Sequence, residues 1–279
     1  MTLPLLLEKR ERGEPIVMVT AYDVPSARAA EAAAVDLVLA GDTAATTVLG
    51  YPDTAAVSLE EMLSLTRAVR RGLRTPLLVG DLPFGSYEQC HPQAIASAQR
   101  LVKEAGCQVV KFEGPSPERA AAIVRAGIPV MGHLGLTPQT TTMLGGGFKV
   151  QARSADPALR LLEDALALQA AGCFALVLEA VPAEVARMVT ERLRIPTIGI
   201  GAGPATDGQV LVLNDLLGIF EDFTPRFVKR YAQLREETVA AVSAFASDVR
   251  ARRFPSQEHC YSIAPAELDQ LRTLLDAHG

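Results

Sequence analysis

Five ionisable residues share one position in the sequence pattern: each comes just past the end of a short, mostly apolar run. They are Asp42 after VDLVLAG, Asp81 after PLLVG, Glu113 after VVKF, His133 after PVMG and Glu179 after ALVL. Near-continuous apolar runs of this length are typical of buried parallel strands. The carboxyl ends of such strands are where α/β folds bind ligands. We therefore expect these carboxylates and the imidazole to meet in one site.

The three acids of the first runs suggest a divalent-metal site. Carboxylate oxygens are the ligands that hard cations prefer, and Mg²⁺ keeps several waters while binding one or two protein carboxylates. Asp42 and Asp81 each follow a glycine, which lets a ligand approach the backbone closely. These two acids, with Glu113 as a further candidate ligand, predict Mg²⁺ bound jointly by protein, water and substrate. The alternative, that each acid caps a helix or pairs with a neighbour, stays open.

Lys111 stands two residues before Glu113, so on a strand both side chains point to the same face. A buried lysine is costly unless it has an anionic partner. A substrate carboxylate would supply that partner. A structural Lys–Glu pair inside the fold is the alternative.

The remaining two residues suggest acid–base chemistry. Glu179 ends an apolar run and is placed to act as a general base. His133 has the strand-end position of the acids, although a lone histidine is often a satisfied core residue. Loss of a proton beside a metal-chelated carbonyl is the reaction class that this arrangement predicts.

Alternating strands and helices must position these residues. Strands are expected near 16–20, 37–40, 77–80, 109–112, 129–131, 175–178, 197–200 and 210–213, and helices over 25–34, 59–71, 92–105, 117–126, 157–171 and 183–193. This order predicts an α/β fold, a (β/α)8 TIM barrel, as a single domain over 1–279. An open doubly wound sheet is the alternative, but no GxGxxG follows the first strand. A C-terminal helical extension over about 226–279 is expected to pack on the barrel or at subunit contacts, with a helical pattern at 226–252 and a short terminal helix.

Composition excludes several classes of function. With 49% hydrophobic residues, the chain of 279 residues can bury a large core. A formal net charge of -5 argues against nucleic-acid binding, which usually requires a basic excess. No apolar stretch reaches the roughly 18 residues of a membrane helix, and the leucines at 5–7 run directly into charged residues, unlike a secretory signal. Cys90, Cys107, Cys173 and Cys260 lack CxxC spacing, which favours reduced thiols and a cytoplasmic location.

Two glycine-rich segments need a separate interpretation. Residues 199–203 (GIGAG) fall at the seventh strand and precede Pro204, so a tight turn with close backbone approach to a ligand is favoured over a dinucleotide loop. Residues 145–147 (GGG) lie in the long connection after the fifth strand. We expect a mobile loop over the site there, with a plain flexible loop as the alternative.

In its motifs the chain resembles the ketopantoate (3-methyl-2-oxobutanoate) hydroxymethyltransferase family. The matching segments are TAYD (20–23), AGDT (40–43), DLPFGSY (81–87), VKFEG (110–114), GHLGLTPQ (132–139), GFKVQ (147–151), LEAVP (178–182), IGIGAGPATDGQVLV (198–212) and FPSQEH (254–259). They run in order over roughly residues 5–260. Three features depart from the family pattern: Thr43 in place of the usual Ser, the segment 52–56, and an extra glycine at 145–147.

The resemblance implies a Mg²⁺-dependent enzyme of pantothenate biosynthesis that moves a one-carbon unit from 5,10-methylenetetrahydrofolate to 3-methyl-2-oxobutanoate, giving 2-dehydropantoate. It implies that Asp42 and Asp81 bind Mg²⁺ directly and Glu113 through water, while Thr43 and Lys111 hold the substrate carboxylate. Glu179 would remove the C3 proton, and His133 would contact the substrate or the transferred hydroxymethyl group. The family is typically a large homo-oligomer, often a decamer.

Two other functions remain possible on the sequence alone. One is a related Mg²⁺-dependent carbon–carbon lyase or mutase of another 2-oxo acid. The other is a non-catalytic, metabolite-binding paralogue. The intact Asp42, Asp81, Lys111 and Glu179 argue against the second, because a copy without turnover has no need of a desolvated base.

Overall fold

The computed structural model describes residues 1–140, 143, 147, 149–220 and 224–278. The chain divides into two compact units, Met1–Ala232 and Gln233–Gly279. The first unit contains the strands and every helix up to α9, and the second contains α10 and α11.

Eight parallel strands close into a barrel in the first unit. They are β1 (Ile16–Thr20), β2 (Leu37–Ala40), β3 (Leu77–Asp81), β4 (Val109–Lys111), β5 (Val130–Gly135), β6 (Ala175–Glu179), β7 (Thr197–Ile200) and β8 (Gly208–Leu211). Each strand pairs with the next in sequence, and β8 closes the ring on β1 with Ile16 opposite Gly208. The predicted (β/α)8 barrel is therefore confirmed, and the open sheet is excluded.

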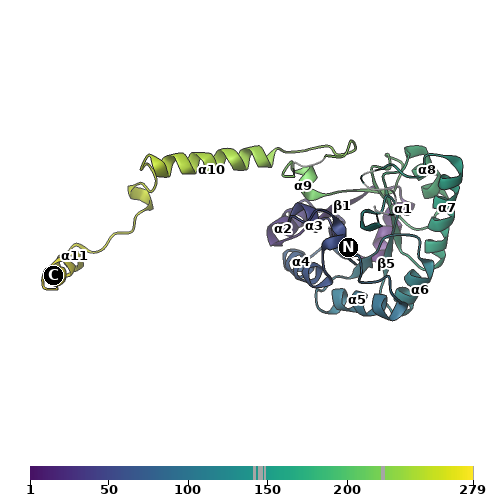
Figure 1. Ribbon diagram of the computed structural model, residues 1–279, viewed down its shortest axis with the longest axis horizontal. Coiled ribbons are helices and arrows are strands. Elements are labelled where there is room, and N and C mark those ends of the chain that lie inside the picture. The colour runs from purple at the N-terminus through teal and green to yellow at the C-terminus, as the bar shows by residue number, and fades with distance from the viewer. Residues whose placement is uncertain (141–142, 144–146, 148, 221–223, 279) are drawn as a thin grey trace. The chain divides into compact units, whose positions relative to one another are not determined.

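Helices surround the ring of strands (Figure 1). They are α2 (Val24–Ala32), α4 (Leu59–Gly72), α5 (His91–Lys103), α6 (Pro117–Arg125), α7 (Ala155–Ala170) and α8 (Ala183–Arg192). Local chemistry sets their starts: α4, for example, begins at a capping box in which Ser58 and Glu61 satisfy each other's backbone N–H groups. All six predicted helices are present, and their ends differ from the prediction by at most two residues.

Alternation along the strands separates two apolar clusters. Leu77 and Val79 of β3 point into the barrel, and Asp81 points the same way at the carboxyl end of the strand. Leu78 points outward, under the helices. Side chains alternate in the same way on β6, where Val177 and Glu179 line the cavity described below. The barrel interior is thus apolar at the amino ends of the strands and charged at their carboxyl ends.

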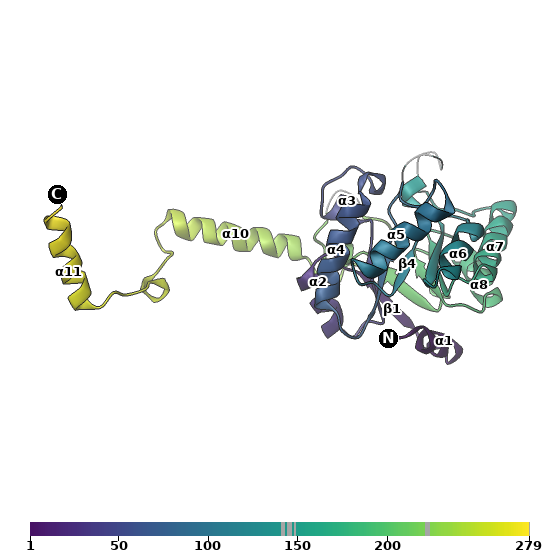
Figure 2. The same ribbon diagram turned by 90° about the horizontal axis from the view of Figure 1, so that it is seen from below.

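A helix that the sequence analysis did not predict closes the amino end of the barrel. α1 (Leu3–Glu11) lies at the end opposite α3 (Ala44–Thr47) (Figure 2). Its Leu6 is 2% exposed and packs with the interior cluster, while Lys9 forms an ion pair with buried Asp36 at 2.7 Å. Leu6, the middle residue of the leucine run at the start of the chain, is therefore part of the core.

Three expected boundaries were wrong. β5 continues through Gly135, because Gly135 pairs with Glu179 across the β5–β6 ladder, so His133 lies inside a strand. β8 covers 208–211 in place of 210–213, because Gly208 already pairs with β1. In the C-terminal tail, α10 (Leu234–Arg250) starts later than the pattern at 226–252 indicated, because the Tyr231 N–H donates to the carbonyl of Leu216 in α9 (Leu213–Leu216). The predicted terminal helix is α11 (Pro265–Asp276).

Two further sequence expectations can be compared with the described residues. None of their helices combines the length and apolar character needed to cross a membrane. The four cysteines are free thiols, with Cys107 and Cys173 buried and Cys90 and Cys260 exposed.

The three consecutive leucines of α1 provide a stability test. Replacing Leu6 by Ala is expected to lower the free energy of unfolding by about 2–5 kcal/mol, because it leaves a cavity under the barrel interior. Leu5, which is 38% exposed, is the matched control, and Leu5→Ala should change that free energy by no more than about 0.5 kcal/mol. Urea denaturation of both variants measures the difference, and equal effects would contradict the packing assigned to α1.

Candidate active site

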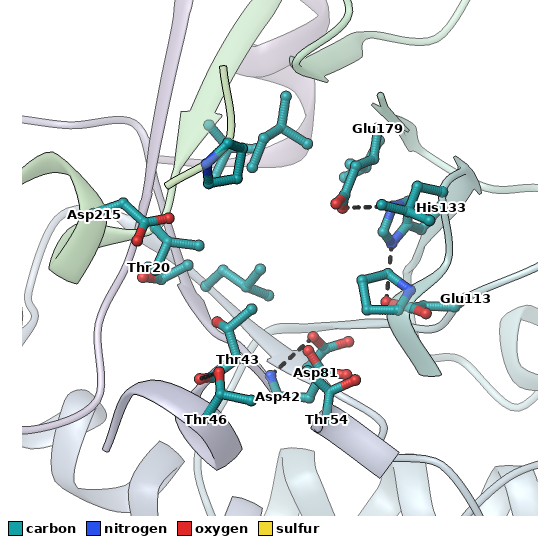
Figure 3. Close-up of a pocket in the computed structure, with 18 of the residues that line it drawn as sticks. Thr20, Asp42, Thr43, Thr46, Thr54, Asp81, Glu113, His133, Glu179 and Asp215 are labelled. Carbon is teal, nitrogen blue, oxygen red and sulfur yellow. Dashed lines mark hydrogen bonds and ion pairs between the residues drawn. The ribbon is translucent and has the colours of Figure 1, made fainter. Parts of the chain in front are cut away.

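A cavity of about 540 Å³ opens at the carboxyl ends of the strands. This volume is typical of small-molecule sites. All seven residues that the sequence analysis placed in a site line it: Asp42, Thr43, Asp81, Lys111, Glu113, His133 and Glu179. Figure 3 shows Asp42, Asp81 and Thr43 along one side and Glu113, His133 and Glu179 along another. The predicted convergence of these side chains on one cavity is therefore observed.

Asp42 and Asp81 are neighbours at the ends of β2 and β3. The Asp42 N–H donates to Oδ2 of Asp81 at 3.2 Å, and both residues are buried. Burial, followed by the negative charges of Asp81 and Glu113, raises the pKa of Asp42 well above its ordinary value. Burial also raises the pKa of Asp81, although Lys111 opposes it. Two buried carboxylates side by side form a site that favours additional positive charge.

Lys111 supplies part of that charge. It stands opposite Asp81 in the β3–β4 register, and its Nζ contacts both Asp81 carboxylate oxygens at 2.8 and 2.9 Å. Glu113 lies farther away, at 3.7 Å from Nζ. The pKa of Lys111 is raised: burial alone would lower it, but the carboxylates of Asp81, Glu113 and Asp42 outweigh burial. The lysine therefore stays charged, and its nearest partner is Asp81 and not the Glu113 considered from the sequence.

His133 lies between two carboxylates. Its Nδ1 is 3.3 Å from Oε1 of Glu113 and its Nε2 is 3.3 Å from Oε2 of Glu179 (Figure 3). These are ion pairs without the alignment of hydrogen bonds. Burial would lower the pKa of His133, but the two carboxylates raise it to about 9, so the ring is a cation at neutral pH. In turn, the positive charges of His133 and Lys111 lower the pKa of Glu113, although its burial would raise it.

Glu179 is the most accessible acid of this group. Its side chain is 14% exposed, against 1% for Glu113. It is the last residue of β6, and Ala180 beyond it has a φ of 48°, a left-handed conformation that is uncommon outside glycine. Ala180 is fixed there by hydrogen bonds to Ile200 and Gln151. Glu179 is therefore held at the cavity while remaining open to a ligand.

Thr43 contributes a hydroxyl to the same cavity. Its Oγ1 is 2.7 Å from the hydroxyl of Tyr22, and either group can donate. Burial raises the pKa of Tyr22 to about 12, so the phenol stays protonated and neutral at neutral pH. Tyr22 belongs to the TAYD segment, but its contact with Thr43 could not be predicted from the sequence pattern.

Gln139 is the residue that sequence reasoning missed. Its Nε2 donates to Oδ2 of Asp42 at 2.9 Å and to the carbonyl of Leu82 at 3.0 Å, and its backbone N–H donates to Oε2 of Glu113 at 3.0 Å. Its Oε1 accepts a hydrogen bond from Tyr87. One buried residue thus links two of the acids, Asp42 through its side-chain amide and Glu113 through its backbone N–H. The available signal was its position at the end of the GHLGLTPQ segment.

The two glycine-rich segments differ in outcome. The turn at 199–203 is present, with φ of 64° at Gly201 and 79° at Gly203. The close neighbours are protein groups: a Cβ on Gly201 would meet the Phe227 ring at 2.5 Å, and one on Gly203 would meet Ala183 at 2.4 Å. These contacts account for glycine at both positions, and the expected approach of a ligand to this turn stays a prediction. Gly147 lines the cavity, whereas 145 and 146 lie outside the described residues.

The donor set fits a hard cation with ligands from more than one source. In formal charge, four carboxylates (Asp42, Asp81, Glu113 and Glu179) face two cations, Lys111 and protonated His133, an excess of two negative charges. The raised pKa of Asp42 reflects its burial and this excess. Across the described part of the chain, no three His, Cys, Asp or Glu side chains are arranged to hold a metal ion by themselves. Oxygen donors from two carboxylates and a substrate would suit Mg²⁺.

Comparison with known proteins identifies the family. The model of the ketopantoate hydroxymethyltransferase family matches residues 1–257. A 3-methyl-2-oxobutanoate hydroxymethyltransferase of Moorella thermoacetica is 53% identical over 94% of this chain and 97% of its own. That of Chloroflexus aurantiacus is 52% identical over 96% of this chain and 95% of its own. The chain belongs to the ketopantoate hydroxymethyltransferase family, which confirms the resemblance seen in its motifs.

Solved structures of low sequence identity share the fold. A phosphonopyruvate hydrolase has a TM-score of 0.61 at 13% identity, covering 100% of this chain and 97% of its own. A phosphonopyruvate hydrolase complex with oxalate and Mg²⁺ has a TM-score of 0.59 at 14% identity, covering 99% and 98%. At these identities the likeness shows the barrel fold alone.

The position of Gln139 generates a test of the acid cluster. Gln139→Leu removes the amide that orients Asp42, so we expect Mg²⁺ to bind about 10- to 100-fold more weakly, the usual effect of losing a group that orients a metal ligand. Gln99→Leu, on the exposed face of α5, is the matched control and should bind as wild type. Calorimetric titration with Mg²⁺ in the presence of 3-methyl-2-oxobutanoate measures both. Unchanged affinity in Gln139→Leu would contradict the orienting role.

Proposed function

We propose that this protein transfers a hydroxymethyl group from 5,10-methylenetetrahydrofolate to 3-methyl-2-oxobutanoate, giving 2-dehydropantoate for pantothenate biosynthesis. Family membership supports the reaction, since relatives about 50% identical carry this enzyme name. The observation that carries the proposal is the placement of Glu179 in the cavity that also contains Asp42, Asp81 and Lys111. A base, a cation site and a positive charge for a carboxylate are what a 2-oxo acid requires.

Asp42 and Asp81 would hold Mg²⁺ directly in this proposal. Glu113 would contribute through water, because its oxygens already contact His133 and the Gln139 N–H. When bound, the cation would polarise the ketone of the oxo acid and stabilise negative charge on its oxygen. Electrostatic stabilisation by one well-placed group is typically about 3 kcal/mol or more of the barrier.

Thr43 and Lys111 would bind the substrate carboxylate. The Thr43 hydroxyl is oriented by Tyr22, and Lys111 carries a positive charge inside the barrel. Lys111 would then lie between the substrate carboxylate and Asp81, which holds its ammonium group in place. His133 would contact the substrate or the transferred hydroxymethyl group with an N–H of its cationic ring.

Glu179 would act as the base. The C3–H bond of the oxo acid breaks, the proton moves to a Glu179 oxygen, and the electron pair enters the enolate. The enolate carbon then forms a bond to the one-carbon unit of the folate. One water is consumed overall, so that the product carries a hydroxyl and tetrahydrofolate leaves. His133 Nε2 lies 3.3 Å from Oε2 of Glu179, which would hold the base in position for proton transfer.

The C-terminal unit supports a proposal about assembly. α10 exposes apolar side chains at helical spacing, among them Val242, Phe245 and Val249. An amphipathic helix of this kind needs a covering surface. We therefore propose that 1–279 acts as one functional domain whose C-terminal helices pack on the barrel or at subunit contacts, in a cytoplasmic homo-oligomer such as the decamer typical of the family.

The proposal is tested by incubating the protein with 3-methyl-2-oxobutanoate, 5,10-methylenetetrahydrofolate and Mg²⁺. We expect 2-dehydropantoate as the product, and deuterium exchange at C3 of the oxo acid with Mg²⁺ alone. Mass spectrometry measures both. Exchange without product at any folate concentration would favour a lyase or mutase of another oxo acid, and absence of both would indicate a non-catalytic protein.

Glu179→Gln is the informative variant in the same assay. It should retain Mg²⁺-dependent binding of the oxo acid but lose C3 exchange, because the amide cannot accept the proton. Glu184→Gln, an exposed acid at the start of α8, provides the matched control and should exchange as wild type. Exchange at the wild-type rate in Glu179→Gln would remove Glu179 from the role of base.

A further inference from the structure

The active-site cavity extends beyond the groups that the oxo acid requires. Apolar side chains line this second part: Ile200, Val210, Val212, Pro225 and Phe227. One carboxylate, Asp215, lies among them. In Figure 3, Asp215 and Thr20 lie on one side of the cavity, opposite Glu179 and His133. The proposed chemistry of the oxo acid leaves this apolar region and its acid without a role.

Asp215 is held firmly by its neighbours in α9. The Leu213 N–H donates to Oγ1 of Thr20 at 2.9 Å, and Nδ2 of Asn214 donates to the Thr47 carbonyl at 3.1 Å. These bonds tie α9 to the end of β1 and to α3. The position of Asp215 is therefore set by its two sequence neighbours.

The Asp215 carboxylate lacks a matching donor. Within the described residues no hydrogen bond reaches it, and Arg230, the cation whose charge acts on it, donates to Oγ1 of Thr224. Burial raises the pKa of Asp215 to about 6, only partly opposed by Arg230. Asp53, the other acid at this mouth, differs because its Oδ1 accepts from the Ala55 N–H at 3.0 Å. A partly buried carboxylate without a donor is costly and gains by accepting hydrogen bonds from a ligand.

The folate co-substrate offers the complementary group. The reduced pterin ring presents an amide N–H and an adjacent amino N–H side by side, the paired-donor geometry that carboxylates accept from guanidinium groups. Its faces are flat and largely apolar, and an apolar cavity with few polar groups binds such a ring well. The rest of the molecule can extend to solvent from the cavity mouth.

We propose that Asp215 recognises the pterin by accepting its paired N–H groups, with the ring packed against the apolar side chains around Val212 and Phe227. The inference rests on the proposed function and adds the co-substrate site to it. The pterin would then enter from the side opposite Glu179, so that its one-carbon unit faces the oxo acid between them. Asp215 is thus a residue that determines specificity for the folate.

The test compares two ligands that differ at the recognised edge. Tetrahydrofolate and its 2-desamino analogue are titrated, under anaerobic conditions with Mg²⁺ and the oxo acid, into wild type and Asp215→Asn. Wild type should prefer tetrahydrofolate by about 10- to 100-fold, the effect of a hydrogen bond to a charged group. In Asp215→Asn this preference should fall to about 2- to 10-fold, which corresponds to a neutral hydrogen bond.

Asp53→Asn is the matched control. It removes the same charge at the same cavity mouth, so it accounts for the general effect of charge on an anionic folate, and it should retain the wild-type preference. A preference that survives in Asp215→Asn, or falls equally in Asp53→Asn, overturns the inference.

The relative affinity of wild type for the two ligands tests the inference even if Asp215→Asn does not fold. Equal binding of the two ligands by wild type overturns recognition through the amino group. In that case, continued formation of 2-dehydropantoate leaves the proposed function in place. Failure of wild type to form product with the natural folate would instead reject the proposed function itself.

Discussion

Four carboxylates at one end of the barrel repel one another, and two cations placed among them make their proximity tolerable. Lys111 bonds to Asp81, and protonated His133 lies between Glu113 and Glu179. Buried ion pairs of this kind contribute little net stability, because the loss of hydration offsets much of the attraction. Their value lies in function: the remaining negative charge makes the cavity a binding site for a cation, and the fixed positive charges prepare it for a carboxylate.

The barrel supplies the rigidity that this charge arrangement needs. β5 and β6 are locked together where Gly135, with φ of 96°, lies against the carbonyl of Glu179, at a distance where any Cβ would meet that oxygen at 2.2 Å. The Leu136 N–H donates to the same carbonyl. On the other side, Gln139 ties the acid of β2 to the loop after β5. The base and the cation site are therefore held by backbone contacts between neighbouring strands, which keeps their separation fixed when a ligand binds.

Much of this arrangement could be predicted from sequence because parallel strands leave a clear signature. Apolar runs such as 37–40 and 197–200 marked strands correctly, and the ionisable residues after five of the runs marked one barrel end. Contacts between strands left no such signature. The pairing of Lys111 with Asp81 follows from the β3–β4 register, and the links made by Gln139 follow from a loop conformation. Neither contact can be read from the pattern of a single strand or helix. The same holds for α1: Leu6 is in the core because it packs on the barrel interior, and the periodicity of the helix does not predict this.

The central claim is that the cation site is completed by the oxo acid, because the described residues offer no three-ligand cage. Calorimetric measurement of Mg²⁺ affinity with and without 3-methyl-2-oxobutanoate tests this most directly. The account predicts that each ligand tightens the other about 5- to 150-fold, the usual range of coupling between linked sites. Equal Mg²⁺ affinity in the presence and absence of the oxo acid would contradict it.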